Sequence, residues 1–279
     1  MTTLSGRTLL ITGASRGIGL AIGLRAARDG ANVAIIGKTQ TPHPKLPGTI
    51  HEAAEQVERA GGHALAIACD IRDESAVDAA LAACVARFGG LDILVNNASA
   101  ISLTGTLATS VNRFDLMMDV NVRGTFVASR AALPHLLAAA QAGRHPHILT
   151  LAPPPTLEPR WFKDHVAYTI AKMGMSLLVV GMADEFRPAG IGINALWPRT
   201  VIATAAIAMI PGADRQTAHM RTPDIVADAA HAILTRDGRT CTGRFFIDEE
   251  VLRESGVSDF SRYAVAPGNT LLPDLFLDG

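Results

Sequence analysis

The chain has 279 residues, 48% of them apolar, so it can bury a substantial core, which excludes a disordered chain. Its 25 lysine and arginine residues nearly balance its 26 aspartate and glutamate residues, which excludes a strongly basic surface for nucleic acid or an anionic membrane and favours a small-molecule partner. Cys69, Cys84 and Cys241 lie far apart without a C-x-x-C pair, which argues against a disulfide framework and favours a reducing compartment.

Short apolar runs alternate with helix-like segments along the chain. Six runs are bounded by Gly, Asp or Pro and are typical of strands buried on both faces of a parallel sheet: 8–12, 31–37, 63–69, 91–96, 147–151 and 191–197. Helix-like segments lie at 17–29, 49–60, 73–87, 109–140, 166–187 and 223–235. This alternation predicts a single-domain α/β protein, residues 1–279, with a doubly wound parallel sheet, the Rossmann fold.

Three segments depart from the alternation. Residues 38–48, KTQTPHPKLPG, predict a rigid Pro-rich loop between the second strand and its helix. Residues 199–222 supply Ala, Ile and Met side chains suited to a lid over an apolar substrate. Residues 249–279 are irregular, and we expect this tail to pack against its own domain or a neighbouring subunit.

Assembly and location follow from the apolar segments. The helices at 109–140 and 166–187 are long and apolar over much of their surface, which predicts a homodimer or homotetramer. The run at 8–12 is too short for a secretory signal or a membrane span, so we expect a cytoplasmic protein with no membrane partner. The nine histidines show no ligand spacing such as H-E-x-x-H, so no metal is predicted.

A glycine-rich stretch, ITGASRGIG at 11–19, joins the first strand to the first helix. Its glycines allow a tight turn and a close approach of the backbone to a pyrophosphate, which the free N–H groups of the helix would bind. Three glycines can also form a simple turn, but the strand, turn and helix context favours nucleotide binding. The predicted cofactor loop comprises Gly13, Ala14, Ser15, Arg16, Gly17, Ile18 and Gly19.

The glycine spacing is G-x-x-x-G-x-G, and it is followed by NNAS at 96–99 and Tyr-x-x-x-Lys at 168–172. With these motifs in this order over about residues 5–250, the chain resembles the short-chain dehydrogenase/reductase family. The resemblance implies an oxidoreductase that transfers a hydride between a nicotinamide and a carbonyl or secondary alcohol. The alternative is a dinucleotide-binding protein with weak or lost catalysis, acting as a binding or assembly module.

The end of the second strand decides which nicotinamide cofactor fits. An acid there hydrogen-bonds the ribose 2′-OH and selects NAD, but this chain has Gly37 followed by Lys38. Lys38 and Arg16 can both meet a 2′-phosphate, and with no opposing acid at that position we predict NADP, with NAD still possible. Either cation could instead be a solvated surface residue.

The resemblance places further residues against the adenosine half of the cofactor. Asp70 ends the third strand and matches the residue that contacts the adenine ring, while Asn97 and Ala98 match residues beside the adenine ribose. The residues by themselves also allow simpler roles, Asp70 as a helix N-cap and the Asn-Asn pair as a turn.

Tyr168 and Lys172 are four residues apart on a predicted helix and project from one face. An ammonium close to a phenol favours the phenolate, so Lys172 would lower the pKa of Tyr168 from about 10 toward the working pH for acid–base catalysis. By the resemblance, Lys172 also holds the nicotinamide ribose, and Asn121 holds a water in a relay to the lysine. The alternatives are a surface Tyr–Lys pair and a polar residue tolerated on a wet helix face.

The serine that orients the substrate in the family is missing. The family places it just after the fifth strand, where this chain has Ala152 and Pro153, and counting back from the tyrosine leads to Pro155. Proline has no N–H and a fixed φ, so this segment offers an apolar wall in place of a donor. Thr156 has the nearest hydroxyl beyond it and could substitute, while Thr150 lies on the strand.

A narrower resemblance covers nearly the whole chain. The stretches PHPKLPGTI, NNASAISL, NALWPRT and APGNTLLPDLFLD are similar to the hydroxysteroid dehydrogenase-like subfamily. This similarity implies that the proline segment is a subfamily feature and that the substrate is lipid-like or steroid-like. Arg199, in WPRT, stands where the family usually has glycine, and it either meets an acidic substrate or cofactor phosphate or faces solvent.

Overall fold

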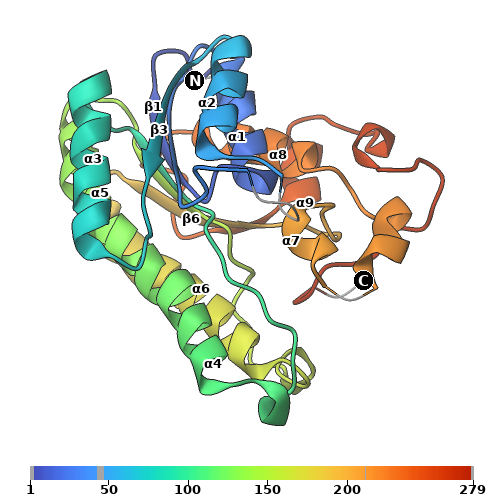
Figure 1. Ribbon diagram of the computed structural model, residues 1–279. Helices are drawn as coiled ribbons and strands as arrows, with labels where there is room; N and C mark the ends of the chain where they lie inside the picture. The colour runs from blue at the N-terminus through green and yellow to red at the C-terminus, as the bar shows by residue number, and fades with distance from the viewer. Residues whose placement is uncertain (1–2, 43–46, 211, 278–279) are drawn as a thin grey trace.

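The computed structural model describes residues 3–42, 47–210 and 212–277. Its centre is a sheet of seven parallel strands in the order β3-β2-β1-β4-β5-β6-β7 (Figure 1). The order reverses between β1 and β4, so the predicted doubly wound sheet is confirmed. The strands span Thr8–Thr12 (β1), Asn32–Gly37 (β2), His63–Ala68 (β3), Ile93–Asn96 (β4), His147–Thr150 (β5), Gly192–Trp197 (β6) and Phe245–Ile247 (β7).

Helices cover both faces of the sheet because its strands are apolar on both sides (Figure 1). In β1, Leu9 and Ile11 belong to the core on one face and Leu10 to the core on the other. The first layer contains α1 (Gly17–Ala27), α2 (Ile50–Arg59), α8 (Asp224–Leu234) and α9 (Asp248–Glu254). The second layer contains α3 (Glu74–Phe88), α5 (Gly124–Gln141) and α6 (Val166–Glu185).

All six predicted strands are present to within two residues, but the sequence analysis missed β7. This strand has three residues and pairs with β6, where Ala195 lies opposite Phe245. A run this short carries no recognisable periodicity, so only its pairing with a neighbour identifies it as a strand.

The helix predicted over 109–140 is helical from 111 to 141, but it is not one regular α-helix. The segment contains α4 (Val111–Met117), a π-helical stretch (Met118–Arg123) and α5. The π-helical stretch carries Asn121, whose side-chain amide hydrogen-bonds the backbone of Ala100 in the segment after β4. Apolar residues continue through the interruption, so periodicity alone does not detect it.

The segments outside the alternation also contain short helices. The tail from residue 249 is not irregular throughout, because it begins within α9 and later forms a 3₁₀ helix, Ser261–Tyr263. Segment 199–222 contains α7 (Ala205–Ala208) and a second 3₁₀ helix, Ala213–His219. Part of the Pro-rich loop, residues 43–46, lies outside the described residues.

Among the described residues, α6 is the one helix that is long and apolar enough to cross a membrane by composition. However, 61% of its most apolar window is buried inside the protein. Burial of this kind is typical of a core helix in an α/β protein, and α6 gives no sign of a membrane span.

Candidate active site

Glycines shape the turn between β1 and α1. Gly13 and Gly17 have φ angles of +67° and +60°, in the left-handed region that glycine adopts without a steric cost. A Cβ atom on Gly13 would lie 2.9 Å from the Cα atom of Ala98, and one on Gly19 would lie 2.5 Å from the side-chain nitrogen of Asn97. The turn therefore requires glycine both for its conformation and for space.

The residues after β4 hold this turn in place. The side-chain nitrogen of Asn97 donates to the carbonyl oxygens of Thr12 (2.9 Å) and Gly13 (3.0 Å). The backbone N–H groups of Asn97 and Ala98 donate to Oγ1 of Thr12 at 3.1 and 3.0 Å. Asn97 and Ala98 thus lie beside the glycine turn at the carboxyl edge of the sheet, where β1 and β4 are neighbours.

The first turn of α1 offers backbone donors to an anion. Its N-cap residue, Arg16, makes no side-chain capping hydrogen bond, and the first N–H groups of a helix have no partner within it. Ala14 and Ser15 are buried and Ile18 packs against the core, so this stretch presents mainly backbone. These residues fit the pyrophosphate of a dinucleotide, which N–H groups and the helix dipole would hold.

Arg16 contacts the chain just beyond β2, where Lys38 also lies. The Arg16 guanidinium donates to Oγ1 of Thr39 (3.0 Å) and to the carbonyl oxygen of Gly48 (2.8 Å). The Nζ atom of Lys38 lies 3.3 Å from a carboxylate oxygen of Asp70. An acid therefore does oppose Lys38, and it comes from the end of β3, where the sequence pattern of β2 could not reveal it.

Asp70 is held by two cations. The Arg72 guanidinium, 2.6 Å away, holds the pKa of the Asp70 carboxyl well below its usual range, and Lys38 adds to the effect. Asp70 does not cap α3, since Asp73 accepts the N–H groups of Ser75 and Ala76. The carboxylate of Asp70 thus lies just beyond β3, paired with Arg72 and Lys38.

Tyr168 and Lys172 lie one turn apart near the start of α6, and both are buried. The Nζ atom of Lys172 donates to the carbonyl oxygen of Leu151 (2.9 Å) and lies 5.2 Å from the centre of the Trp197 ring. Burial lowers the pKa of Lys172 to about 8. The ammonium is therefore held inside the protein by a backbone carbonyl and an aromatic face.

The expected lowering of the Tyr168 pKa is not found. Burial among apolar side chains raises the pKa of the phenol, and the Asp274 carboxylate raises it further. Lys172 is not among the groups that shift the pKa of Tyr168 in this arrangement. The phenol therefore keeps its proton at neutral pH.

Asn121 is fully buried in the π-helical stretch. Its Oδ1 atom accepts the N–H of Ala100 (2.7 Å), and its Nδ2 atom donates to the Ala100 carbonyl oxygen (3.0 Å). This pair of bonds fixes the chain just beyond Asn97 and Ala98. The relay role that the resemblance implies for Asn121 stays a prediction.

The segment at the missing serine is apolar, as expected. Ala152 and Pro153 are buried, and the Pro153 carbonyl oxygen accepts the hydroxyl of Ser176 (2.7 Å). Thr150 is also buried, and its hydroxyl has no hydrogen-bond partner among the described residues.

Thr156 is the better placed of the two threonines. Its N–H donates to the Met173 sulfur (3.4 Å) on α6, the helix that carries Tyr168. Its Oγ1 atom accepts the N–H of Glu158 (3.1 Å), which leaves the hydroxyl proton free to donate.

Arg199 does not present a free charge. Its backbone N–H donates to Asp248 (2.9 Å), and its guanidinium forms an ion pair with Glu250. The sequence analysis considered contact with an acidic substrate or cofactor phosphate, or exposure to solvent, and did not foresee this ion pair.

The sequence analysis missed the aromatic surroundings of Tyr168. Trp161 and His165 precede α6, Trp197 ends β6, and Phe276 comes from the tail more than 100 residues after Tyr168. The apolar composition of the tail indicated that it packs somewhere, but gave no sign of where.

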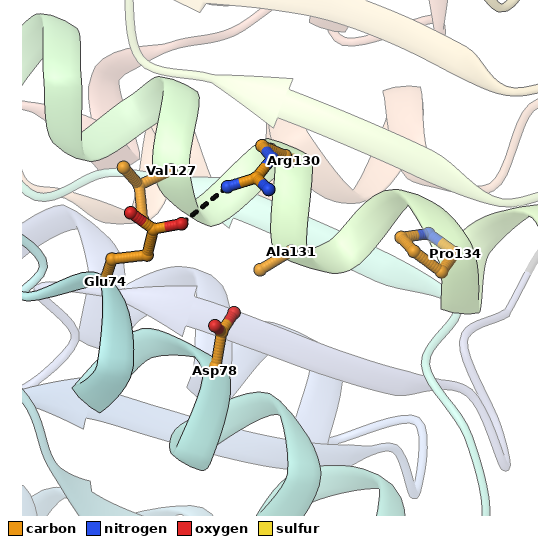
Figure 2. A pocket seen from close by; sticks show the side chains of 6 residues that line it. All are labelled: Glu74, Asp78, Val127, Arg130, Ala131 and Pro134. Carbon is orange, nitrogen blue, oxygen red and sulfur yellow. Dashed lines mark hydrogen bonds and ion pairs between the residues drawn. The ribbon is translucent and has the colours of Figure 1, made fainter.

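A hollow away from these residues lies between α3 and α5 (Figure 2). Figure 2 shows the Arg130 guanidinium directed at the Glu74 carboxylate across its rim, with Asp78 on the α3 side. None of the residues predicted for catalysis or cofactor binding lines it. Among the described residues, no group of three or more His, Cys, Asp or Glu side chains could hold a metal ion, and the expected absence of a metal stays a prediction.

Comparison with known proteins identifies the family. The family model described as short chain dehydrogenase matches residues 7–211. The chain belongs to the short-chain dehydrogenase family. This places the chain in a family of dehydrogenases, as its motifs predicted.

Curated relatives match almost the whole chain. Hydroxysteroid dehydrogenase-like protein 2 of Danio rerio is 55% identical over 99% of this chain and 65% of its own length. The protein of that name from Rattus norvegicus is 56% identical over 99% of this chain and 51% of its own length. The narrower resemblance is confirmed, and the chain spans between 51% and 65% of the length of these relatives.

Solved structures share the fold. A proposed dehydrogenase from Xanthomonas campestris is 63% identical, with a TM-score of 0.95, and covers 99% of this chain and 100% of its own. A 3-ketoacyl-(acyl-carrier-protein) reductase from Brucella melitensis, solved with NADH, is 29% identical, with a TM-score of 0.74, over 88% of this chain and 97% of its own.

Proposed function

We propose that the chain, as a single domain of residues 1–279, is an NADP(H)-dependent oxidoreductase for a carbonyl or secondary alcohol on an apolar, lipid-like or steroid-like molecule. The observation that carries this proposal is the placement of Tyr168 and Lys172 at the start of α6. Because α6 follows β5 in a parallel sheet, it starts at the same carboxyl edge as the glycine turn after β1. Dinucleotide binding alone would not require a phenol there.

In the proposed mechanism, Tyr168 donates its phenolic proton to the carbonyl oxygen during reduction and accepts a proton from the alcohol during oxidation. A bound nicotinamide supplies or accepts the hydride. Lys172 keeps a positive charge at the site and binds the nicotinamide ribose. Because its pKa is raised in this arrangement, the phenol holds a proton for the reductive direction, and it must lose that proton before it can act as the base in oxidation.

The preference for NADP rests on the two cations at the end of β2. Arg16 reaches Thr39, the residue after Lys38, which supports a site in which both cations would bind the 2′-phosphate of NADP. The ion pair between Lys38 and Asp70 is on the surface, and the Lys38 side chain is 61% exposed. Such a pair contributes little, so a phosphate can replace the carboxylate as the partner of Lys38.

Two further parts complete the proposed substrate site. Thr156 would donate to the substrate carbonyl in place of the missing serine. The segment 199–222 would form the lid, since its Ala203, Thr204 and Ala205 line a hollow together with Arg16 and Gly17 of the phosphate turn.

Assembly and location are part of the proposal. Phe126 on α5 and Leu177 and Val180 on α6 are 48%, 62% and 48% exposed, which supports a homodimer or homotetramer that covers these helices. Cys69, Cys84 and Cys241 are unpaired and buried, which supports a reducing, cytoplasmic environment.

The second candidate is a dinucleotide-binding module without catalysis, favoured by the prolines at the serine position. A panel of ketones and alcohols, assayed with NADPH and NADP, separates the two. We expect Tyr168→Phe to reduce turnover by about 10²–10⁴-fold. Tyr263→Phe is the matched control, because Tyr263 is the only other tyrosine and donates to Asp228 on α8. Equal, near-zero rates for wild type and Tyr168→Phe across the panel would support the binding module.

A further inference from the structure

The C-terminal segment, residues 272–277, lies across the carboxyl end of β6. The N–H of Val201 donates to the carbonyl oxygen of Leu272 (3.0 Å). The N–H of Asp274 donates to the carbonyl oxygen of Arg199 (3.0 Å). The indole N–H of Trp197 donates to the Leu275 carbonyl oxygen (2.8 Å). These contacts direct the next residue of the segment toward α6.

That next residue, Phe276, lies inside an enclosure of four aromatic side chains, which we call the aromatic box. The distances from its ring centre are 6.0 Å to Trp161, 6.5 Å to His165, 6.4 Å to Tyr168 and 5.8 Å to Trp197. Phe276 is only 5% exposed. The phenyl ring therefore fills the space next to the proposed proton donor.

The packing of Phe276 closes the site. Its ring is stacked on the Tyr168 ring with an interplanar angle of 29°, and Tyr168 is itself 5% exposed. A proton donor must come within about 3 Å of the oxygen that it protonates. A substrate cannot approach the phenol in this way while Phe276 remains in the aromatic box.

The backbone of Phe276 is strained. Its φ angle is +73°, and the other non-glycine residues with positive φ in the described chain are His145 and Asp164. A bulky side chain in this region carries a conformational cost that the surrounding contacts must offset. Release of the segment relieves this cost, so docking of Phe276 is suited to being reversible.

We propose that Phe276 is a removable occupant of the substrate site, and that the aromatic box binds an apolar ring of the substrate once the C-terminal segment has moved out. This inference rests on the proposed function, because it assigns the box to the same site. Four rings around a phenyl group make a space for a cyclic, uncharged ketone or alcohol. A flexible linear chain would lose more conformational freedom on entering it.

Tryptophan fluorescence reports on this site directly, because the only two tryptophans of the chain, Trp161 and Trp197, both belong to the aromatic box. The titration compares 4-tert-butylcyclohexanone with 2-decanone, a linear ketone with the same number of carbons. If wild type is open about a tenth of the time, Phe276→Ala should bind the cyclic ketone about tenfold more tightly. The gain for 2-decanone should be about the same, because Phe276 excludes both ketones alike, but 2-decanone should bind more weakly than the cyclic ketone to both proteins.

Two variants serve as controls for the titration. Phe276→Tyr keeps a ring in the box and should bind like wild type. Val265→Ala removes a 39% exposed side chain elsewhere in the tail and should also leave binding unchanged. Unchanged or weaker binding of the cyclic ketone to a folded Phe276→Ala would show that Phe276 is a fixed wall of the site and would overturn the proposal.

Amide hydrogen exchange on the wild-type protein tests the same movement without any variant. The N–H groups of Val201 and Asp274 are bonded only across the contact with the C-terminal segment, so the cyclic ketone should accelerate their exchange. Binding of the ketone with no change in this exchange would contradict the proposal. Neither measurement needs turnover, so a protein that binds the ketone as expected but reduces nothing would count against the proposed function alone.

Discussion

The phosphate turn at the cofactor end comes from two short stretches, 11–19 and 96–98, whereas the substrate end combines segments between residues 150 and 277. The glycine turn is fixed by backbone geometry and by Asn97, one residue beyond β4. The aromatic box instead combines side chains from before α6, from α6 and from β6, and it encloses Phe276 of the tail. Backbone recognition can be encoded locally, while a fitted apolar site needs side chains from distant elements.

The cofactor end and the substrate end also differ in how accessible their functional groups are. The first turn of α1 presents N–H groups that have no partner within the helix, so it is ready for a phosphate. Tyr168 is covered, and its pKa is raised by burial and by Asp274. The following variants test each end separately, beginning with the largest expected effect.

The largest effect is expected for Thr156→Val at the substrate end. If the Thr156 hydroxyl replaces the missing serine, its removal should reduce kcat by about 10²–10³-fold, because one donor to the developing oxyanion is lost. Steady-state kinetics with NADPH and a cyclic ketone measure kcat. The affinity for NADPH should be unchanged. Thr235→Val, which removes a hydroxyl bonded within α8, is the control. Normal kcat in Thr156→Val would assign the donor elsewhere.

At the cofactor end, Gly13→Val should weaken NADPH binding by about 10²-fold, because a side chain at positive φ and close to Ala98 distorts the turn. Fluorescence titration of NADPH measures the affinity. Gly90→Val is the control, since a Cβ there would meet nothing within 4 Å. Equal affinity of the Gly13 variant and wild type would remove the turn from the cofactor site.

A smaller effect is expected for the choice between the two cofactors. Lys38→Ala and Arg16→Ala should each weaken NADPH binding by about tenfold and leave NADH binding nearly unchanged, since each removes a charge-assisted bond to the 2′-phosphate. Arg59→Ala removes a surface cation paired with Glu55 on α2 and should alter neither affinity. If Lys38→Ala and Arg16→Ala both keep the wild-type ratio of NADPH to NADH affinity, the argument for NADP fails.

The smallest effect is a pH dependence of stability at Asp274. Burial raises the pKa of the Asp274 carboxyl to about 7. The nearby Asp248 carboxylate of α9 raises this pKa further, and the Lys172 ammonium of α6 lowers it. Tyr168 of α6 also faces this carboxyl. Because the pKa of this carboxyl is higher in the folded than in the unfolded protein, its protonation favours folding at low pH. This contribution is lost as the pH rises from about 4, the unfolded value, through about 7, the folded value. Wild type should therefore lose stability over this range relative to Asp274→Asn.

Thermal unfolding between pH 5 and pH 8 measures the effect of Asp274. The Tm of Asp274→Asn should rise relative to wild type by about 2–4 °C across this range, the shift expected for about 1 kcal/mol in a chain of this size. Asp184→Asn, at a side chain that is 86% exposed, should show no such trend. A constant difference in Tm between Asp274→Asn and wild type at all pH values would mean that the Asp274 carboxyl does not titrate in the folded protein.

The sequence by itself determined the sheet, the glycine turn and the positions of Tyr168 and Lys172. Six strands and most helices follow from apolar periodicity, and the turn follows from glycines whose φ angles and spacing only that residue allows. These features depend on neighbours in the chain, so a linear pattern is sufficient to recognise them.

Only the tertiary structure decided what surrounds those residues. Asp70 opposes Lys38 because β2 and β3 are adjacent, and the π-helical turn at Asn121 forms against Ala100. Phe276 covers Tyr168 although more than 100 residues separate them in the chain. Burial and charge at a site depend on contacts between distant segments, and these contacts set the pKa of Tyr168 in the direction opposite to the one that its helical neighbour indicates.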